Sequence, residues 1–256
     1  MSKKIVLLGG KGISTTAVYN SVDKEHGITL TIIEEKENSK VFIKRRIKRL
    51  GLLTVLGQIS FQLVVPKALS VFSKKRRKQI IEQSQLDFSE IPADKIKKVS
   101  SVNAPETIAL LQEINPDLII VNGTRIISKK VISAVECRFI NTHAGITPKY
   151  RGVHGAYWAM ANNDIENCGV TVHFVDEGID TGTVIAQEKV AMSSSDNFTT
   201  YPLVQLSKGL ELLNKAIADF FNNTLVVQKE KSMSSNLYYH PTLWYYLGKL
   251  IFKGIK

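Results

Sequence analysis

The chain of 256 residues contains only two cysteines, and this scarcity excludes several classes of protein. Cys137 and Cys168 form no Cys-x-x-Cys pair, and no second cluster of cysteine and histidine has the ligand spacing of a structural zinc site. We therefore expect neither a disulfide framework nor a metal, and a reducing cytoplasm fits best. The apolar run from Ile5 to Leu8 is too short for the core of a secretion signal, so we expect a first strand there.

Acidic residues are missing from one long stretch, and their absence explains the overall charge. The formal net charge is +11, which by itself is typical of proteins that bind nucleic acid. From Lys40 to Ile80, however, the chain has twelve basic residues and no acidic one. Since +11 minus +12 is −1, the rest of the chain is nearly neutral. We therefore expect the excess positive charge to lie on one local surface, and we do not expect the protein to bind nucleic acid.

A run without any charge lies inside this basic stretch, from Leu50 to Pro66. Its seventeen residues are at the lower limit of about 17–25 for a transmembrane helix. A single crossing would also separate the first strands from the rest of a sheet that needs both. We therefore expect this segment either to pack on the domain with a solvated basic face or to lie in the interface of an anionic membrane.

The C-terminal run from Leu243 to Lys253 has a similar aromatic and basic character. The sequence thus predicts two candidate contacts with the inner face of a membrane, at residues 40–80 and 243–256. The alternative, a cover that only packs on the domain, stays open.

Hydrophobic patterns along the chain predict an α/β fold. Lys4 to Gly10 is expected to form a buried strand, a helix follows from Ser14, and Ile28 to Ile33 is expected to form a second strand. We expect a doubly wound, Rossmann-like parallel sheet in residues 1–190, with a basic amphipathic insertion at about 40–80 and a helical, aromatic C-terminal appendage in residues 191–256. Further strands are expected at Leu118–Asn122, Phe139–Ile140, Gly169–Val175 and Val184–Val190, with helices at Asn103–Leu111, Ser128–Val135 and Gly155–Met160 and from Leu203 onward.

Two polar motifs stand at the ends of predicted strands. Asn141-Thr-His143 follows the strand at Phe139–Ile140, and a Gly-Ile-Asp-Thr-Gly loop containing Asp180 follows the strand that begins at Gly169. Ligand sites in open parallel sheets gather at the carboxyl ends of the strands. We therefore expect Asn141, His143 and Asp180 to lie at a functional site. Each alone has a simpler interpretation, as a capping asparagine, a loop histidine or a turn aspartate.

These motifs resemble those of the folate-dependent formyltransferase family over roughly residues 4–190, and most strongly from Asp117 onward. The resemblance implies transfer of a formyl group from 10-formyltetrahydrofolate to an amine, without a metal. It also implies that Asn141 and His143 donate hydrogen bonds to the developing oxyanion, and that Asp180 sets the protonation of His143 and relays a proton through water. One departure stands out: many members carry serine and leucine where this chain has Gly145 and Thr147.

The resemblance also implies binding residues. For the folate these are Arg125, Ile126, Ile127, Val175, Asp176, Glu177 and Gly178, and for the acceptor they are Gly10, Lys11, Gly12, Tyr150, Arg151, Gly152 and His154. Each set has a structural alternative, such as an ordinary turn after a strand, and for His154 a binding and a structural role are equally expected. His173 is interpreted as a sheet histidine without a role in the site.

The acceptor is predicted by elimination and resemblance. Members of the family from purine synthesis lack a basic insertion, which this chain has. The members that act on tRNA carry a C-terminal β-barrel, whereas the region after Val190 in this chain has no regularly spaced strands. A nucleotide-linked amino sugar for surface polysaccharide is therefore our first expectation. Methionyl-tRNA, glycinamide ribonucleotide, and hydrolysis of the formyl-folate are the alternatives, although hydrolases usually add an N-terminal domain and here the first strand comes at once. A nicotinamide enzyme is disfavoured because Thr15 replaces the third glycine of the dinucleotide motif. A homodimer is left open.

Overall fold

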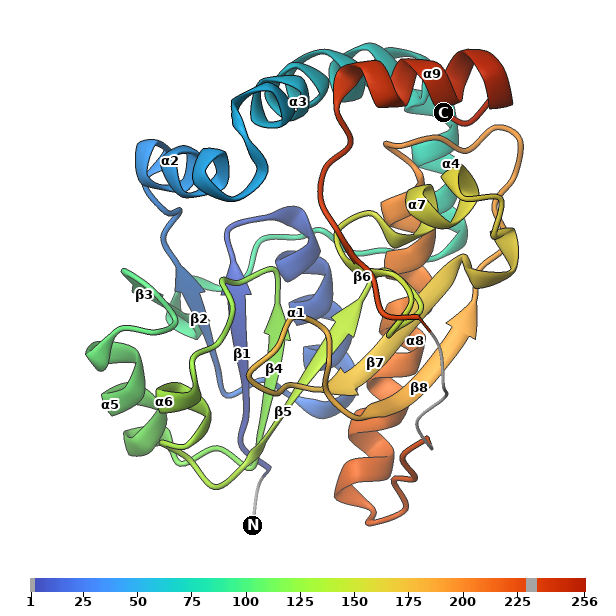
Figure 1. Cartoon of the computed structure of the whole chain (residues 1–256). Helices are drawn as coiled ribbons and strands as arrows, with labels where there is room; N and C mark the ends of the chain where they lie inside the picture. Colours follow the sequence, from blue (N-terminus) through green and yellow to red (C-terminus); the bar gives the residue numbers. More distant parts are fainter. Residues whose placement is uncertain (1–2, 229–233) are drawn as a thin grey trace.

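The computed structural model describes residues 3–228 and 234–256, and a seven-stranded sheet forms its centre (Figure 1). The strands are β1 (Ile5–Gly10), β2 (Leu30–Glu34), β3 (Ile96–Val99), β4 (Leu118–Asn122), β5 (Arg138–His143), β7 (Gly169–Phe174) and β8 (Val184–Lys189). They lie in the order β3-β2-β1-β4-β5-β7-β8. Strands β1 and β4 are continuous apolar runs because helices bury them on both faces.

The predicted doubly wound α/β fold is confirmed, although the sheet is mixed and not parallel throughout. Strands β3, β2, β1, β4 and β5 are parallel, whereas β7 runs antiparallel to both β5 and β8. The chain passes from β7 to β8 through the loop 175–183, which contains no crossover helix. Adjacent strands joined by such a loop must run in opposite directions.

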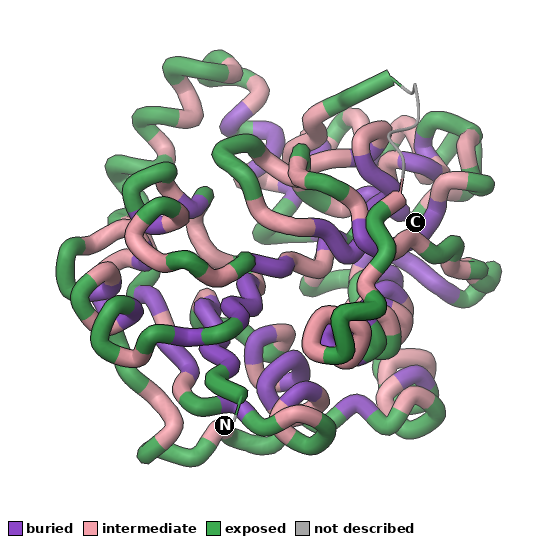
Figure 2. The backbone as a smooth tube through the Cα atoms, turned by 90° about the horizontal axis from the view of Figure 1, so that it is seen from below, coloured by how far each residue is buried: buried purple, intermediate pink, exposed green. Residues whose placement is uncertain are grey.

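Two helical layers cover the sheet. Helices α1 (Ile13–His26) and α8 (Tyr201–Phe221) pack on one face, where Val22 and Ile217 are fully buried. Helices α5 (Pro105–Ile114) and α6 (Lys129–Ile132) pack on the other. Viewed from below, the buried backbone runs through the interior and exposed segments surround it (Figure 2). Because α8 shares its core with β1, this part of the predicted C-terminal appendage packs directly on the sheet.

The basic insertion forms three consecutive helices, α2 (Ser39–Leu50), α3 (Leu52–Phe72) and α4 (Lys74–Gln83). Helix α3 packs with α7 (Gly155–Ala161) and α9 (Leu243–Lys253) in a third core, in which the rings of Phe61 and Tyr246 lie 5.2 Å apart. Figure 1 shows α2, α3 and α9 as a layer above the carboxyl ends of the strands. The remaining elements are the short strands β6 (Arg151–Gly152) and β9 (Leu237–Tyr238), which pair with each other, and the single turns η1 (Ala93–Lys95) and η2 (Ile165–Asn167).

Candidate active site

Two of the three predicted catalytic residues lie within strand β5 itself. The strand extends to His143, beyond its predicted end at Ile140, because it pairs with β4 on one side and β7 on the other. The register places Asn141 between Val121 and His173. Alternation along the strand then turns Asn141 and His143 to the same face of the sheet.

Asp180 reaches these residues from the loop between β7 and β8. Its backbone adopts a left-handed conformation with φ of 52°. One carboxylate oxygen, Oδ2, accepts a hydrogen bond of 2.8 Å from the Gly152 N–H and lies 3.3 Å from His143 Nδ1. Gly152 has a φ of 94°, and a Cβ there would lie 2.2 Å from the Tyr238 carbonyl oxygen. The contact that holds Asp180 therefore requires glycine at position 152.

His143 is enclosed by oxygen acceptors. Its Nε2 lies 2.6 Å from the carbonyl oxygen of Tyr150, and its Nδ1 faces Asp180. Burial lowers the pKa of His143, and the carboxylate of Asp180 opposes that shift. The ring can donate to both neighbours only when it is protonated, so each nitrogen of a protonated His143 would have an acceptor. A Cβ at Gly145 would lie 2.6 Å from Nε2, so a serine there would require the ring or the backbone to shift.

Asp180 stays ionised at neutral pH. Burial alone would raise the pKa of its carboxyl group, but His143, His173 and the Gly152 N–H outweigh burial and lower the pKa to about 2. An ionised carboxylate beside a buried imidazole can accept a proton or stabilise a protonated ring. The pair of Asp180 and neutral His143 carries one negative charge, and uptake of a proton neutralises it.

His173 belongs to the site, although the sequence interpretation left it out. Its Nδ1 donates to the carbonyl oxygen of Phe174 at 2.7 Å, which leaves Nε2 to accept a hydrogen bond of 3.1 Å from the Asn141 amide. Nε2 also lies 3.7 Å from Asp180 Oδ1. The signal that could have identified it is the pairing of β5 with β7, because this register sets His173 opposite Asn141.

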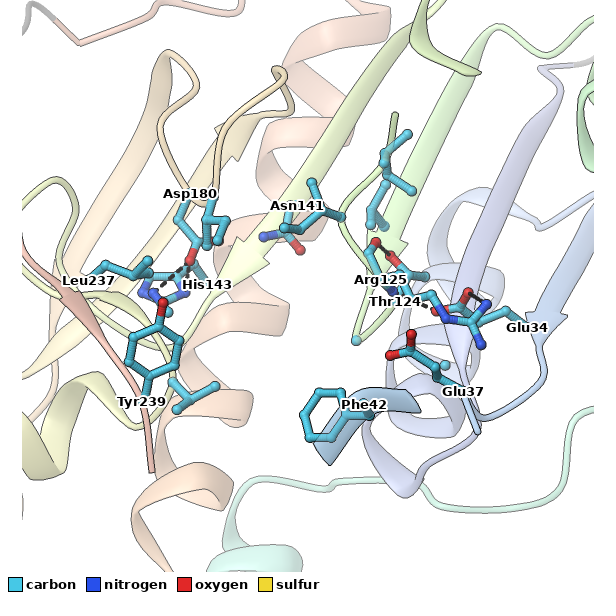
Figure 3. A pocket seen from close by; sticks show the side chains of 18 of the residues that line it. Glu34, Glu37, Phe42, Thr124, Arg125, Asn141, His143, Asp180, Leu237 and Tyr239 are labelled. Carbon is cyan, nitrogen blue, oxygen red and sulfur yellow. Dashed lines mark hydrogen bonds and ion pairs between the residues drawn. The ribbon is translucent and has the colours of Figure 1, made fainter. Parts of the chain in front are cut away.

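The cluster forms one wall of a cavity of about 1250 Å³. Figure 3 shows Asn141, His143 and Asp180 on one side, and Arg125, Glu34 and Glu37 across the space from them. Helix α2 and the segment 237–240 close the cavity from above. A volume of this size exceeds the range of about 300–1000 Å³ that is common for one small ligand. It is large enough for two reactants side by side.

The loop after β4 forms the opposite wall and is braced by a salt bridge. The Arg125 guanidinium bonds to Glu34 at 3.1 Å and to the carbonyl oxygens of Glu35 and Ser100. The carboxylate of Glu34 also accepts from the Arg125 backbone N–H at 2.5 Å. Arg125 thus lines the cavity with both terminal nitrogens of its guanidinium hydrogen-bonded to the protein. Because Glu34 is committed to this brace, it is not free to bind a ribose, which counts against the nicotinamide alternative.

The structure brings most of the predicted site residues to this cavity. Those that line it are Asn141, His143, Asp180, Arg125, Ile126, Ile127, Val175, Asp176, Gly178, Gly10, Lys11 and Gly152, whereas Glu177, Gly12, Tyr150, Arg151 and His154 are not part of its lining. Tyr150 is buried and its hydroxyl donates to Asp164 at 2.7 Å. The Arg151 guanidinium donates to the carbonyl oxygen of Ile179. The binding roles of these five residues therefore stay predictions, and in this structure the side chains of Tyr150 and Arg151 bond to neighbouring parts of the chain.

Helix α2 forms the roof of the cavity and contributes residues that we did not predict to belong to the site. Arg46 and Arg49 of α2 line the cavity, and the guanidinium of each lies over the ring of Tyr239, at 5.5 and 5.4 Å from its centroid. Arg46 Nε donates to Gln58 Oε1, while its Nη2 is buried without a hydrogen-bond partner among the described residues. The basic run was visible in the sequence, but nothing local in it indicated that α2 folds over the strand ends.

Within residues 3–228 and 234–256, no group of three or more histidine, cysteine, aspartate or glutamate side chains is placed to hold a metal ion.

Comparison with known proteins identifies relatives for this arrangement. The sequence profile of the family described as formyl transferase matches residues 57–216, which include Asn141, His143 and Asp180. A methionyl-tRNA formyltransferase from Caldanaerobacter subterraneus subsp. tengcongensis is 29% identical over 153 residues, covering 59% of this chain and 48% of that protein. The chain thus spans about half the length of this curated relative.

Solved structures share the fold. A sugar N-formyltransferase from Shewanella sp. FDAARGOS_354 superposes with a TM-score of 0.57 at 17% identity, covering 93% of this chain and 77% of the other. An N-formyltransferase from Helicobacter canadensis, in complex with folinic acid and dTDP-3-aminofucose, gives a TM-score of 0.56 at 20% identity, covering 91% and 70%.

Proposed function

Because this chain belongs to the formyl transferase family, we propose that it transfers a formyl group from 10-formyltetrahydrofolate to the amine of a nucleotide-linked amino sugar destined for surface polysaccharide. The observation that carries the proposal is the cluster of Asn141, His143 and Asp180 on the wall of a cavity that can hold two reactants. The matched family region contains all three residues.

The cluster provides what formyl transfer to an amine requires. The amine nitrogen attacks the formyl carbon, an oxyanion develops on the formyl oxygen, and the attacking nitrogen must lose a proton. His173 accepts one N–H of the Asn141 amide, which leaves the other N–H for the oxyanion. Asp180 is ionised and stands beside His143, so the pair can receive the proton directly or through a water molecule.

The wall across from the cluster suits a folate. Val121, Ile127 and Val175 line the cavity there, and the side chain of Ile126 is 55% exposed although it belongs to the same wall. An apolar side chain that is exposed to the inside of a cavity is suited to contact with an apolar or aromatic ring of a ligand. These residues would hold the pterin ring, and the Arg125 brace would keep their loop in place. The folate supplies the formyl group that the amine attacks.

The roof and the first loop suit an acceptor that carries phosphate. Lys11 lies after β1, and Arg46 and Arg49 lie on α2, all three on the same cavity. The buried Nη2 of Arg46 has no partner within the described chain and can donate to a phosphate oxygen. The complex of the Helicobacter canadensis enzyme with a dTDP-linked sugar supports a nucleotide-linked acceptor of this kind.

Methionyl-tRNA is the second candidate, and the sequence relatives favour it. Several curated relatives are named methionyl-tRNA formyltransferases, at 29–41% identity over part of the chain. Helix α2 also carries the exposed residues Lys40, Lys44 and Lys48, which are not part of the cavity lining and would meet an RNA backbone from outside. The two candidates therefore differ in whether phosphate is recognised inside the cavity or along the outside of α2.

Incubation of the protein with 10-formyltetrahydrofolate and a panel of amino-sugar nucleotides tests the proposal. Mass spectrometry should reveal the gain of one carbonyl on at least one amino-sugar nucleotide. Methionyl-tRNA and a reaction without amine are run in parallel. If methionyl-tRNA alone is formylated, the acceptor is the RNA and not a sugar nucleotide. If formate is released and no amine is formylated, the reaction is hydrolysis and not transfer.

A further inference from the structure

Helices α3 and α9 present an outer face that the fold leaves uncovered. On α3, the side chains of Leu53, Leu56, Leu63 and Val71 are 49–75% exposed, and on α9 those of Trp244 and Ile251 are 56% and 72% exposed. We call these six residues the α3–α9 face. Positions 56, 63, 67 and 71 recur at the spacing of one side of a helix, so this is a continuous stripe on α3.

We propose that the α3–α9 face docks the protein on the surface of an anionic lipid membrane. Soluble helices normally turn their polar side outward, and an exposed apolar stripe on two adjacent helices marks an interaction surface. The proposal concerns where the protein works, and it stands whatever amine the active site accepts.

The two helices form one surface because they are locked together. A Cβ at Gly57 would lie 2.3 Å from the Trp244 indole, so the absence of a side chain in α3 lets α9 lie directly against it. Figure 1 shows the two helices side by side in the outermost layer. Trp244 remains half exposed at this contact. Tryptophan at such an edge suits the headgroup region of a bilayer, where one part of the ring is apolar and the other meets water.

Charge identifies the membrane as anionic. Exposed basic residues flank the face: Lys48 on α2, Lys67 within the stripe on α3, and Lys74 and Lys75 at the start of α4. Across the described residues, none of these four ammonium groups lies within salt-bridge distance of a carboxylate. Lys67 can bury its aliphatic stem in the apolar stripe while its charge reaches the lipid phosphates. Cationic side chains around an apolar stripe match an anionic interface.

The packing of α3 favours a helix that lies in the membrane plane. By length and composition alone α3 could cross a bilayer, and it is the single such helix in the described chain. Its inner side, however, holds Phe61 and Val65 in the third core, and Gln58 donates to the His240 carbonyl oxygen at 2.8 Å. Crossing would break these contacts, whereas insertion to headgroup depth leaves them intact.

A second copy of the chain is the other occupant that an apolar face suggests. Two copies joined through this face would bring their basic borders together without acidic partners, since residues 40–80 contain no aspartate or glutamate. Repulsion between like charges opposes that dimer. The same charges attract anionic lipid, so the charge pattern favours the membrane.

Vesicle co-sedimentation tests the proposal. The wild-type protein is expected to bind vesicles of phosphatidylglycerol and phosphatidylcholine at least about tenfold more tightly than vesicles of phosphatidylcholine alone at low salt. Leu56→Glu combined with Leu63→Glu should lower that binding by about tenfold or more. The matched control is Val226→Glu with Val227→Glu, which changes two exposed valines in the segment after α8, at the opposite end of the molecule (Figure 1). The control should bind within about twofold of wild type.

Further measurements distinguish loss of binding from misfolding and from self-association. Circular dichroism and the melting temperature establish that each variant is folded. Quenching of tryptophan fluorescence by brominated lipid tests the wild-type protein itself, because Trp244 should be quenched while Trp158, which bonds to the Tyr239 carbonyl oxygen, should be less affected. Sedimentation without vesicles reports on a dimer. The proposal is overturned if folded wild-type protein fails to bind anionic vesicles at low salt, if the double variant binds as well as the control, or if the face mediates only self-association.

Discussion

The catalytic wall and the outer helical layer of this molecule are held together by different kinds of interaction. Asn141, His143 and Asp180 are fixed by hydrogen bonds and by the register of β5 with its neighbours. The layer of α3 and α9 is fixed by shape, with Gly57 accommodating an indole from a distant part of the sequence. Chemistry requires polar atoms at set distances, whereas a cover requires only complementary surfaces. Single changes should therefore affect either turnover or stability, depending on which region they alter.

The largest expected effect comes from Asp180→Asn. Asparagine can still accept from the Gly152 N–H, but it cannot take up a proton or stabilise a protonated His143. We expect formyl transfer to fall by about 10²–10³-fold or more, with the melting temperature nearly unchanged. Steady-state kinetics and thermal unfolding measure the two quantities. A folded Asp180→Asn protein that turns over at the wild-type rate would contradict the role assigned to the carboxylate.

Gly57→Val should have the opposite profile. The new side chain would collide with Trp244, and such overpacking costs about 1–3 kcal/mol of unfolding free energy. Gly248→Val in α9 is the matched control, because a Cβ there meets nothing within 4 Å. Denaturant unfolding compares the two. Equal stability of both variants would mean that α3 and α9 are not locked together at Gly57.

His173→Ala tests whether a residue that does not itself react positions Asn141. Without the Nε2 acceptor the Asn141 amide is free to rotate, so we expect kcat to fall about tenfold while KM for the folate changes little. His173→Gln, whose side-chain oxygen can accept the same hydrogen bond, should recover part of the loss. Equal damage in both variants, or a change confined to KM, would point to a purely structural role.

The effect of pH on stability depends on the contact between His154, before α7, and His240, before α9. Burial lowers the pKa of His154 to about 3 and that of His240 to about 4, and the two rings form a hydrogen bond of 2.9 Å. Below the unfolded pKa of about 6.5, the unfolded chain binds protons that the folded chain does not. The unfolding free energy should therefore fall from pH 7 to pH 5, by up to roughly 2 kcal/mol for each of the two rings.

His154→Asn should flatten this pH dependence, since asparagine also tolerates the left-handed backbone at position 154 and does not titrate in this range. Chemical unfolding at pH 7, 6 and 5 compares it with wild type. A wild-type stability that rises as the pH falls would contradict the buried neutral pair.

The sequence predicted the regions whose pattern is local. Leu118–Asn122 forms a strand with the predicted bounds, because an apolar run flanked by breakers has few alternatives. The family motifs likewise predicted that Asn141, His143 and Asp180 belong to one site, and all three line the same cavity. His173 was missed because its role depends on an antiparallel pairing that no local pattern reveals. The roof residues Arg46 and Arg49 were missed because the direction of α2 is set by packing with segments far along the chain.

The most direct test of the account follows the carbon atom that the site is proposed to move. The protein is mixed with 10-formyltetrahydrofolate labelled with ¹³C in the formyl group and with the best amino-sugar nucleotide from the panel, and the products are followed by NMR. We expect a ¹³C-formamide signal on the sugar nitrogen with wild-type protein, and its near absence with Asn141→Ala of equal melting temperature. Label that appears only as free formate, or at the same rate on the sugar with Asn141→Ala, would contradict the account.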